Sequence, residues 1–359
     1  MLETIKAIGV LDYDKWLEPK RFDYTPRDMR PVDVDIKIIA CGICGSDIHC
    51  AKGDWGRPYA PIAVGHEIVG HIVALGDEVD KSKFHIGDRV GVGAQCDSCS
   101  SCWRCVNGFQ NNCDEQQTTY GSTYPDGTNN QGGYANYIRI SNRFVFKIPD
   151  ALDTLSAAPL MCGGITGFKP LLSAGVKKGT KVGVRGIGGI GHMCILFAKA
   201  MGAEVTAISR SDRKKELAKK LGADHYIATS NPEFPASYKD KFDVVVNTAS
   251  TFDASQVKSV MSTLRPSGKF VFITAPPISV KLEFEPFFML HGSYSIGGSA
   301  IGSPADIEYM LQFAADNKIK PWVETMDINE ADVCTAWKRM ESGDVKFRFV
   351  LTGYDKYFV

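Results

Sequence analysis

With 359 residues, 44% of them hydrophobic and 23% charged, the chain has the composition of a folded protein large enough for two domains. Lys plus Arg and Asp plus Glu each number 41, so the formal net charge is zero and no basic block suggests a nucleic-acid or anionic membrane partner. No segment approaches the ~20 apolar residues of a membrane-spanning helix. We therefore expect a cytoplasmic protein that acts on small molecules.

Residues 1–153 have the pattern of a mainly β domain. Runs rich in β-branched residues are bounded by Gly and Pro, which is typical of short strands separated by turns. These runs cover residues 32–42, 66–79, 87–94 and 132–140. We therefore expect a small β-barrel in this part of the chain.

Residues 154–294 alternate between short apolar runs and helical segments. The strand-like runs are 181–186, 203–209, 225–228, 242–250 and 269–276, and the clearest helical segments are 192–201 and 213–222. This alternation predicts βαβ units and a doubly wound parallel sheet, so the chain as a whole is of the α/β class. Residues 295–359 contain two amphipathic helical segments and a final strand-like run, which we expect to pack back on the first domain.

A series of closely spaced cysteines predicts a structural zinc site. Cys99, Cys102, Cys105 and Cys113 follow the spacing C-x2-C-x2-C-x7-C. Four thiolates on a short loop can complete a tetrahedral zinc shell, and the clustering is unlike a disulfide framework. Cys96 lies one step upstream, so spacing alone leaves the register open. The series contains a single Arg, which disfavours a nucleic-acid-binding zinc module.

A second metal site is indicated further upstream. The segment CGICGSDIH begins at Cys41, and His66 and Glu67 follow within a strand-like run. Thiolate, imidazole and carboxylate groups together suit zinc. Spacing alone does not choose between Cys41 and Cys44. Candidates for a further thiolate are Cys50, Cys162, Cys194 and Cys334.

A glycine pattern in the predicted parallel-sheet domain indicates a dinucleotide site. Gly186, Gly188 and Gly191 form G-x-G-x-x-G between a strand-like run and a helical segment. At such a turn, backbone N–H groups and the helix N-terminus can approach a pyrophosphate. Arg185 precedes the first glycine, where a buried strand would normally have an aliphatic residue, and the pattern gives no reason for it.

The end of the next strand-like run predicts NADP over NAD. An NAD-specific fold has an acid here, about 20 residues after the glycines, which binds the ribose 2'-hydroxyl. This chain instead has Ser209, Arg210, Arg213 and Lys214, whose cations can pair with a 2'-phosphate. Asp212 argues the other way, although an acid in the first turn of a helix also stabilises the helix dipole.

The order of these features resembles the zinc-containing medium-chain alcohol dehydrogenases. The pattern GHE-x2-G-x5-G-x2-V at residues 65–79 precedes the cysteine series and the glycine pattern. Three further motifs are similar to the cinnamyl alcohol dehydrogenase branch, especially its fungal NADP-dependent members: GVGAQ at 91–95, QGGYANY at 131–137 and RFVLTGYDK at 348–356. The resemblance covers nearly the whole chain. It implies a GroES-like β-barrel catalytic domain, completed by the C-terminal segment, and a Rossmann cofactor domain.

The resemblance also implies ligands for two zinc ions per chain. The implied ligands of the catalytic zinc are Cys44, His66 and Cys162. They form the Cys2His set with an open fourth position that is typical of alcohol dehydrogenase. Glu67 resembles the glutamate behind the metal, which can approach it when the fourth ligand leaves. The structural zinc takes Cys99, Cys102, Cys105 and Cys113, which settles the register against Cys96.

Other residues receive roles by the same resemblance. Asp47 is expected to orient the ligand imidazole, although a turn residue that caps its own backbone is the alternative. Ser46 and His49 match a proton relay, with a surface histidine of no role as the alternative for His49. Trp55 and Phe287 are candidates for the substrate pocket. The implied cofactor contacts are Gly186, Gly188, Gly189, Ile190, Gly191, Ser209, Arg210, Ser211, Lys214 and Thr166.

We therefore expect reduction of aromatic (cinnamaldehyde-like) and medium-chain aldehydes by NADPH, with zinc polarising the carbonyl group. A polyol or sugar dehydrogenase of the same superfamily is the alternative enzyme, but it would need a polar pocket. A non-enzymatic redox sensor would leave the catalytic ligands dispensable. The resemblance further suggests a homodimer joined through the cofactor domains, with residues 278–296 as the candidate contact.

Overall fold

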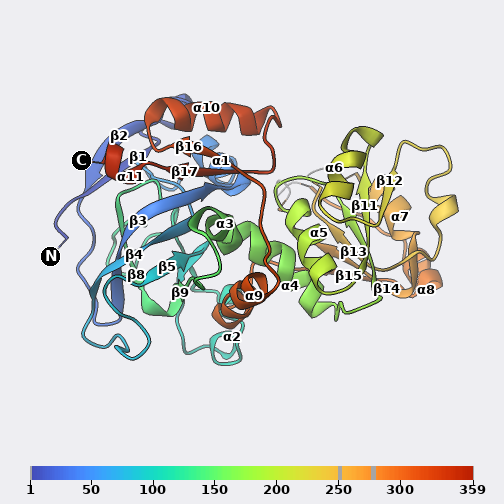
Figure 1. Cartoon of the computed structure of the whole chain (residues 1–359), viewed down its shortest axis with the longest axis horizontal. Coiled ribbons are helices and arrows are strands. Elements are labelled where there is room, and N and C mark those ends of the chain that lie inside the picture. The colour runs from blue at the N-terminus through green and yellow to red at the C-terminus, as the bar shows by residue number, and fades with distance from the viewer. Residues whose placement is uncertain (1, 250–252, 276–279, 359) are drawn as a thin grey trace. The chain divides into compact units, whose positions relative to one another are not determined.

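The computed structural model describes residues 2–249, 253–275 and 280–358. The chain divides into two compact units, the first formed by Met1–Cys162 with Gly302–Val359 and the second by Gly163–Ile301. Figure 1 labels the elements of both units. The predicted runs 242–250 and 269–276 and the candidate contact 278–296 each include residues outside the described ones.

The first unit is mainly β, as predicted. Its main sheet contains β3 (Asp33–Ile43), β4 (Glu67–Leu75), β5 (Arg89–Val92), β8 (Tyr137–Ser141), β9 (Val145–Lys147), β16 (Val323–Asp327) and β17 (Arg348–Thr352). The strand order is β16-β17-β3-β4-β5-β9, and β8 also pairs with β3. Two smaller pairs join β1 (Ile5–Gly9) to β2 (Lys20–Tyr24) and β6 (Gln95–Asp97) to β7 (Gln117–Thr118).

The C-terminal segment returns to the first unit because β17 pairs antiparallel with β3. The helices of this unit are α1 (Gly45–Lys52), α2 (Trp103–Val106), α3 (Thr154–Pro159), α9 (Pro304–Asp316), α10 (Glu330–Glu341) and α11 (Tyr354–Tyr357). Helix α10 begins where the Asn329 side chain accepts the N–H of Asp332, and it lies beside β16 (Figure 1). Its Trp337 is fully buried and stacks on Trp16.

The second unit is a parallel sheet in the order β12-β11-β10-β13-β14-β15, which confirms the predicted doubly wound arrangement. Its strands are β10 (Lys181–Arg185), β11 (Glu204–Ser209), β12 (His225–Ala228), β13 (Phe242–Asn247), β14 (Leu264–Phe272) and β15 (Ser295–Gly298). Its helices are α4 (Ile165–Ser173), α5 (Gly191–Ala200), α6 (Lys215–Lys220), α7 (Ala254–Met261) and α8 (Pro286–Gly292).

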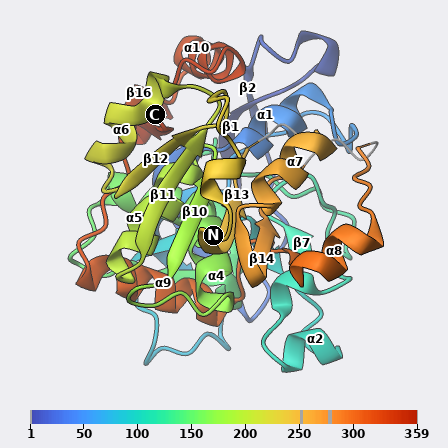
Figure 2. The same ribbon diagram turned by 90° about the vertical axis from the view of Figure 1, so that its right-hand side faces the viewer.

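Helices cover both faces of this sheet, with α5 and α7 on opposite sides (Figures 1 and 2). This explains why consecutive residues of β13, Val244, Val245 and Val246, are all buried. The strand order reverses between β10 and β13, and ligands of doubly wound sheets bind at such a switch point. Among the described residues, no helix combines the length and hydropathy needed to cross a bilayer.

Candidate active site

Cys44 lies where strand β3 ends and helix α1 begins. Its N–H donates to the Asp47 carboxylate at 2.8 Å, so Asp47 caps the first turn of the helix. Cys44 therefore stands at a helix N-terminus, where the positive end of the helix dipole favours a thiolate. Cys41, three residues earlier on β3, is fully buried, and its thiol donates to the backbone oxygen of Gly42 at 3.4 Å.

Cys44, His66, Glu67 and Cys162 form one buried group. One ligand atom of each residue lies within 4.8 Å of the others, and the two sulfur atoms are 3.9 Å apart. His66 Nε2 is buried and has no hydrogen-bond partner within the described residues. Two thiolates, an imidazole and a carboxylate with this spacing fit a zinc ion. The metal-binding groups found among the described residues do not include Cys41, Cys50, Cys194 or Cys334.

Local backbone geometry contributes to this group. Cys162 lies in a single turn of π-helix, Leu160–Gly164, and such turns are frequent at functional sites. His66 and Glu67 stand at the start of β4, where Glu67 pairs with Gly42 of β3. A Cβ atom at Gly42 would overlap the Glu67 carboxylate, so the glycine leaves room for it.

The electrostatics favour an ionised Cys44. Its pKa is held well below the ordinary value, because the Cys162 thiol hydrogen-bonds to it and the neighbouring His66 and Arg348 side chains favour the thiolate. Burial lowers the pKa of His66, but the neighbouring Cys44 and the Asp47 carboxylate outweigh this and raise it to about 9. Burial raises the pKa of Glu67 to about 7, although Arg348 acts in the opposite direction. A thiolate is the form in which cysteine binds a metal.

Arg348 is a residue of this site that sequence reasoning missed. It begins β17 and donates to Glu67 Oε1, and both side chains are buried. The strand registers place Arg348 beside Glu67. Phe349, the residue after Arg348, pairs with Ile43 on β3, and the adjacent Gly42 pairs with Glu67 on β4. The motif RFVLTGYDK contains this arginine, but nothing local to that motif points to Glu67.

Asp47 has no hydrogen bond to the His66 imidazole within the described residues, so the expected orienting role stays a prediction. The Asp47 oxygens accept from the N–H groups of Cys44 and Gly65. They also accept from the Tyr120 hydroxyl, whose oxygen lies 2.7 Å from Asp47 Oδ1. The Tyr120 ring stacks on His66 with ring centroids 5.3 Å apart. Asp47 thus caps its own turn, and Tyr120 connects it to the imidazole. No sequence signal identified Tyr120.

The expected relay residues lie on α1. The Ser46 hydroxyl is 3.7 Å from the Cys44 sulfur. His49 Nδ1 is 2.8 Å from Asp54 Oδ2, and the ring stacks on Trp55 with centroids 4.9 Å apart. The His49 side chain is 45% exposed, so it is open to water. Ser46 is therefore beside the metal-binding group, whereas His49 lies at the protein surface.

The structure brings together the four cysteines expected at the structural zinc, Cys99, Cys102, Cys105 and Cys113. Their sulfur atoms all lie within 4.8 Å of one another. Individual separations are 3.8 Å for Cys99 and Cys105 and 3.9 Å for Cys102 and Cys113. Cys96 is outside this group, because its sulfur contacts the Thr118 carbonyl at 3.2 Å and the Tyr124 hydroxyl at 3.4 Å. Four thiolates at these distances fit a closed zinc shell.

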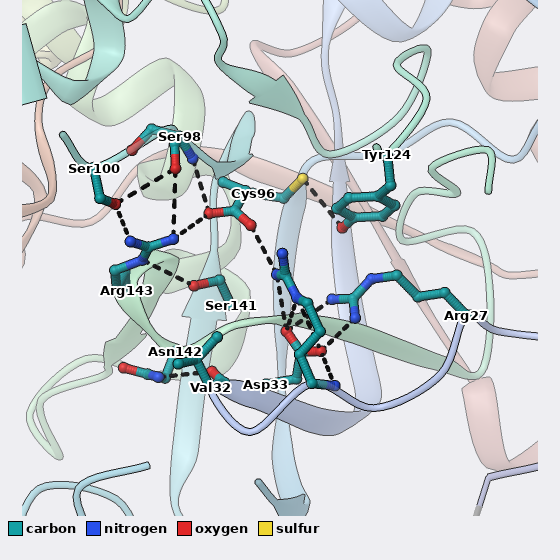
Figure 3. Close-up of polar contacts among 12 residues, drawn as sticks. Arg27, Val32, Asp33, Cys96, Ser98, Ser100, Tyr124, Ser141, Asn142 and Arg143 are labelled. Carbon is teal, nitrogen blue, oxygen red and sulfur yellow. Dashed lines mark hydrogen bonds and ion pairs between the residues drawn. The ribbon is translucent and has the colours of Figure 1, made fainter. Parts of the chain in front are cut away.

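A cluster of ion pairs connects this loop to the barrel strands. The buried Asp97, just before the cysteine series, pairs with Arg30 and Arg143, each at 2.7 Å. Arg143 also donates to Ser100 inside the loop (Figure 3), and Arg30 pairs with Asp33 on β3. These contacts provide the loop with an anchor that does not depend on the metal.

We expect Asp97→Asn to weaken this anchor. The substitution removes a charge shared by two arginines that are about 40% exposed. Solvent screening reduces the effect of such pairs, so the expected cost is about 1–3 kcal/mol, with faster zinc release from the loop to a chromogenic chelator. Asp114→Asn, which removes the exposed partner of Arg104, is the matched control and should release zinc at the wild-type rate. Equal release rates for both variants would contradict the anchoring role.

A cavity of about 520 Å³ lies at the switch point of the second unit. Its lining includes Gly186 and Gly188, and from the end of β11 it includes Ser209, Arg210, Ser211, Arg213 and Lys214. Gly186 has φ +94°, and a Cβ atom there would be 2.9 Å from the backbone nitrogen of Ala249, so the turn requires glycine. Lys214 Nζ donates to the Ile187 carbonyl at 2.7 Å.

Other predicted cofactor and pocket residues lie outside this lining. Gly189 and Ile190 are in the turn before α5, which begins at Gly191. Thr166 is buried on α4, and Phe287 lies on α8 with 78% of its surface exposed. The structure therefore groups the 2'-phosphate candidates with two of the glycines, and it places Thr166 and Phe287 elsewhere in the second unit.

Comparisons with known proteins identify the family of the chain. Two family models match, "Alcohol dehydrogenase GroES-like domain" over residues 30–150 and "Zinc-binding dehydrogenase" over residues 189–316. NADP-dependent alcohol dehydrogenase 6 of Saccharomyces cerevisiae is 45% identical over 99% of this chain and 98% of its own. A cinnamyl alcohol dehydrogenase of Sorghum bicolor has a TM-score of 0.90 at 33% identity, over 98% of both chains. CAD of Helicobacter pylori, complexed with NADP(H), has a TM-score of 0.89 at 32% identity, over 99% of both chains.

The fold and the two cysteine-containing groups thus define a zinc-binding dehydrogenase. The chain belongs to the zinc-containing medium-chain alcohol dehydrogenases, and within them to the cinnamyl alcohol dehydrogenase branch. It is therefore an oxidoreductase, and the predicted family and fold class are confirmed.

Proposed function

We propose that the chain reduces aldehydes to primary alcohols with NADPH, and that aromatic (cinnamaldehyde-like) and medium-chain aldehydes are its substrates. The observation that carries the proposal is the cavity of the second unit. There Ser209, Arg210 and Lys214 line the place where an NAD-specific sheet has an acid. The names of the yeast and Helicobacter pylori relatives, which refer to NADP, support this cofactor.

Metal binding completes the proposal. Cys44, His66 and Cys162, with the neighbouring Glu67, would hold the catalytic zinc, and the group Cys99, Cys102, Cys105 and Cys113 would hold the structural zinc. When bound, the catalytic zinc acts as a Lewis acid toward a carbonyl oxygen. Arg348 donates to the buried Glu67 carboxylate and opposes the effect of burial on its pKa, and the Tyr120 ring stacks on the His66 ring. These contacts keep the ligands in place before substrate arrives.

Proton delivery uses groups on α1. The Ser46 hydroxyl, close to Cys44, donates a proton toward the substrate oxygen. His49, exposed at the surface, is proposed as the outer end of the relay, and its Nδ1 lies 2.8 Å from Asp54 Oδ2. The Trp55 ring stacks on His49, and we propose it as an aromatic contact for the substrate beside the relay. Phe287 is proposed as a second aromatic contact.

The two structural units correspond to the two proposed roles. The unit of residues 1–162 and 302–359 is proposed as the catalytic domain, and the unit of residues 163–301 as the NADP-binding domain, in place of the boundaries 153/154 and 294/295 expected from the sequence. Thr166, Gly189, Ile190 and Gly191 are proposed as further cofactor contacts. We also propose a cytoplasmic homodimer. A reducing compartment supports the first point because it keeps zinc-binding cysteines as thiols. The exposed edge strand β15 supports the second, since such an edge can pair with another chain.

The test is the initial rate of cofactor oxidation with cinnamaldehyde, on protein whose zinc content per chain is known. We expect two zinc ions, fast oxidation of NADPH and slow oxidation of NADH. Lys214→Gln should reduce the NADPH preference by about tenfold to 100-fold, because one charge-assisted contact is lost. Lys220→Gln is the matched control, since Lys220 is an exposed residue of α6 outside the cavity lining.

Different failures of this test point to different errors. Two zinc ions with a preference for NADH would contradict the cofactor assignment and leave the zinc assignment standing. Full zinc content without aldehyde reduction by either cofactor would contradict the proposed activity, and turnover of sugar alcohols under the same conditions would then establish the polyol alternative.

A further inference from the structure

Arg185 is an unusual residue at the end of a central parallel strand. It pairs in register with Ile208 of β11 and with Asn247 of β13, and its side chain is only 6% exposed. One guanidinium nitrogen donates to Asn247 Oδ1 at 2.7 Å, and another donates to Gln256 Oε1 of α7 at 3.2 Å. The guanidinium is therefore held in a fixed position between β13 and α7.

Packing alone does not account for an arginine here. Elsewhere on the same strand, Val182 and Val184 are buried aliphatic residues, which is what a sheet covered on both faces requires. Burial lowers the pKa of Arg185, and Asp253 only partly offsets this. Burying a guanidinium costs free energy that an aliphatic side chain would not. A residue that costs stability at a ligand cavity is a candidate for function.

Arg185 and the 2'-phosphate candidates line the same cavity from different elements. The segment after β11 contributes Arg210, Arg213 and Lys214, whereas Arg185 ends β10 and its guanidinium donates to Gln256 of α7. Their hydrogen-bond partners differ too, because Arg185 donates to Asn247 and Gln256, whereas Lys214 donates to the Ile187 carbonyl. A volume of about 520 Å³ exceeds what a single phosphate group fills.

The chemistry of NADP(H) indicates what occupies the remaining space. The adenine ring is attached to the same ribose as the 2'-phosphate. When that phosphate contacts the β11 segment and the pyrophosphate contacts the glycine turn, the ring is held within the rest of this cavity. A planar guanidinium can stack on a heteroaromatic ring or donate to its ring nitrogens.

We propose that the Arg185 guanidinium, held by Asn247 and Gln256, contacts the adenine ring of NADP(H) and contributes to its affinity independently of the 2'-phosphate. The inference rests on the proposed function, since it assumes that the cavity takes NADP(H). It assigns a cofactor contact to a residue that neither the glycine pattern nor the basic segment explains.

The test compares wild type with Arg185→Gln in binding measurements that need no turnover. Calorimetry with adenosine 2'-monophosphate, which has the adenine ring and the 2'-phosphate but lacks the 5'-diphosphate, should show roughly tenfold weaker binding by the variant. Fluorescence titrations with NADPH and with NADH should show both weakened by the same factor, so that their ratio is unchanged. Lys214→Gln is the comparison variant, in which the ratio should fall.

The other outcomes are informative. Unchanged binding of adenosine 2'-monophosphate would overturn the inference and leave Arg185 a structural residue. A selective loss of NADPH affinity would also overturn it, because Arg185 would then be a 2'-phosphate contact. Absence of NADPH binding by wild type would overturn the proposed function as well. If thermal melting shows that Arg185→Gln does not fold, Arg185→Lys, which keeps the charge but loses the planar group, should show the same weakening.

Discussion

Replacement of Cys44 by serine will remove one zinc ion per chain and reduce kcat/KM for aldehyde reduction by on the order of 10³-fold or more. The Cys44 sulfur is 3.9 Å from that of Cys162 and belongs to the buried group with His66 and Glu67. A serine hydroxyl is a poor substitute for a thiolate on zinc, and loss of the Lewis acid removes several kcal/mol of transition-state stabilisation. Zinc analysis and steady-state kinetics on the same preparation measure both effects.

The matched control is the other cysteine of the same segment. Cys41→Ala removes a buried sulfur that packs near Gly65 and Gly133, so it should cost about 1 kcal/mol of stability while retaining two zinc ions. If Cys41→Ala instead loses zinc and Cys44→Ser retains it, the two cysteines have been assigned in the wrong order. The comparison also separates the catalytic site from the cysteine series 99–113, which neither substitution touches.

The features that the sequence predicted well are those whose partners are close along the chain. The cysteine series and the glycine turn each depend on spacings shorter than 20 residues, so local pattern located the cysteine loop and the start of α5, while the family resemblance excluded Cys96 from the series. The alternation of strands and helices likewise revealed the parallel sheet, because every strand in a covered sheet must be apolar.

The features that the sequence did not predict depend on contacts between distant segments. Arg348 is 281 residues from Glu67 and reaches it only because β17, β3 and β4 pair in one register. Tyr120 stacks on His66 from a loop with no recognisable motif. The Asp47 carboxylate accepts from the Tyr120 hydroxyl as well as from the backbone of the turn that presents Cys44, and the sequence predicted neither contact. Spacing carries no information about such partners.

Arg348→Met will lower the free energy of unfolding of the first unit by about 3–5 kcal/mol, because it leaves the Glu67 carboxylate buried without its partner. The measurement is urea denaturation of the zinc-loaded protein followed by tryptophan fluorescence. All five tryptophans, Trp16, Trp55, Trp103, Trp322 and Trp337, belong to the first unit, so the signal reports on that unit alone.

Two further variants determine whether the loss arises from the buried charge. Arg348→Met combined with Glu67→Gln removes both charges, and it should recover a large part of the stability lost by Arg348→Met, since a buried pair replaced on both sides leaves no uncompensated ion. Arg339→Met, also in the C-terminal segment, breaks partly exposed pairs with Glu324 and Asp344 and should cost no more than about 1 kcal/mol. Equal losses for Arg348→Met and Arg339→Met would mean that Arg348 contributes through side-chain packing, and the argument that it holds Glu67 behind the metal would fail.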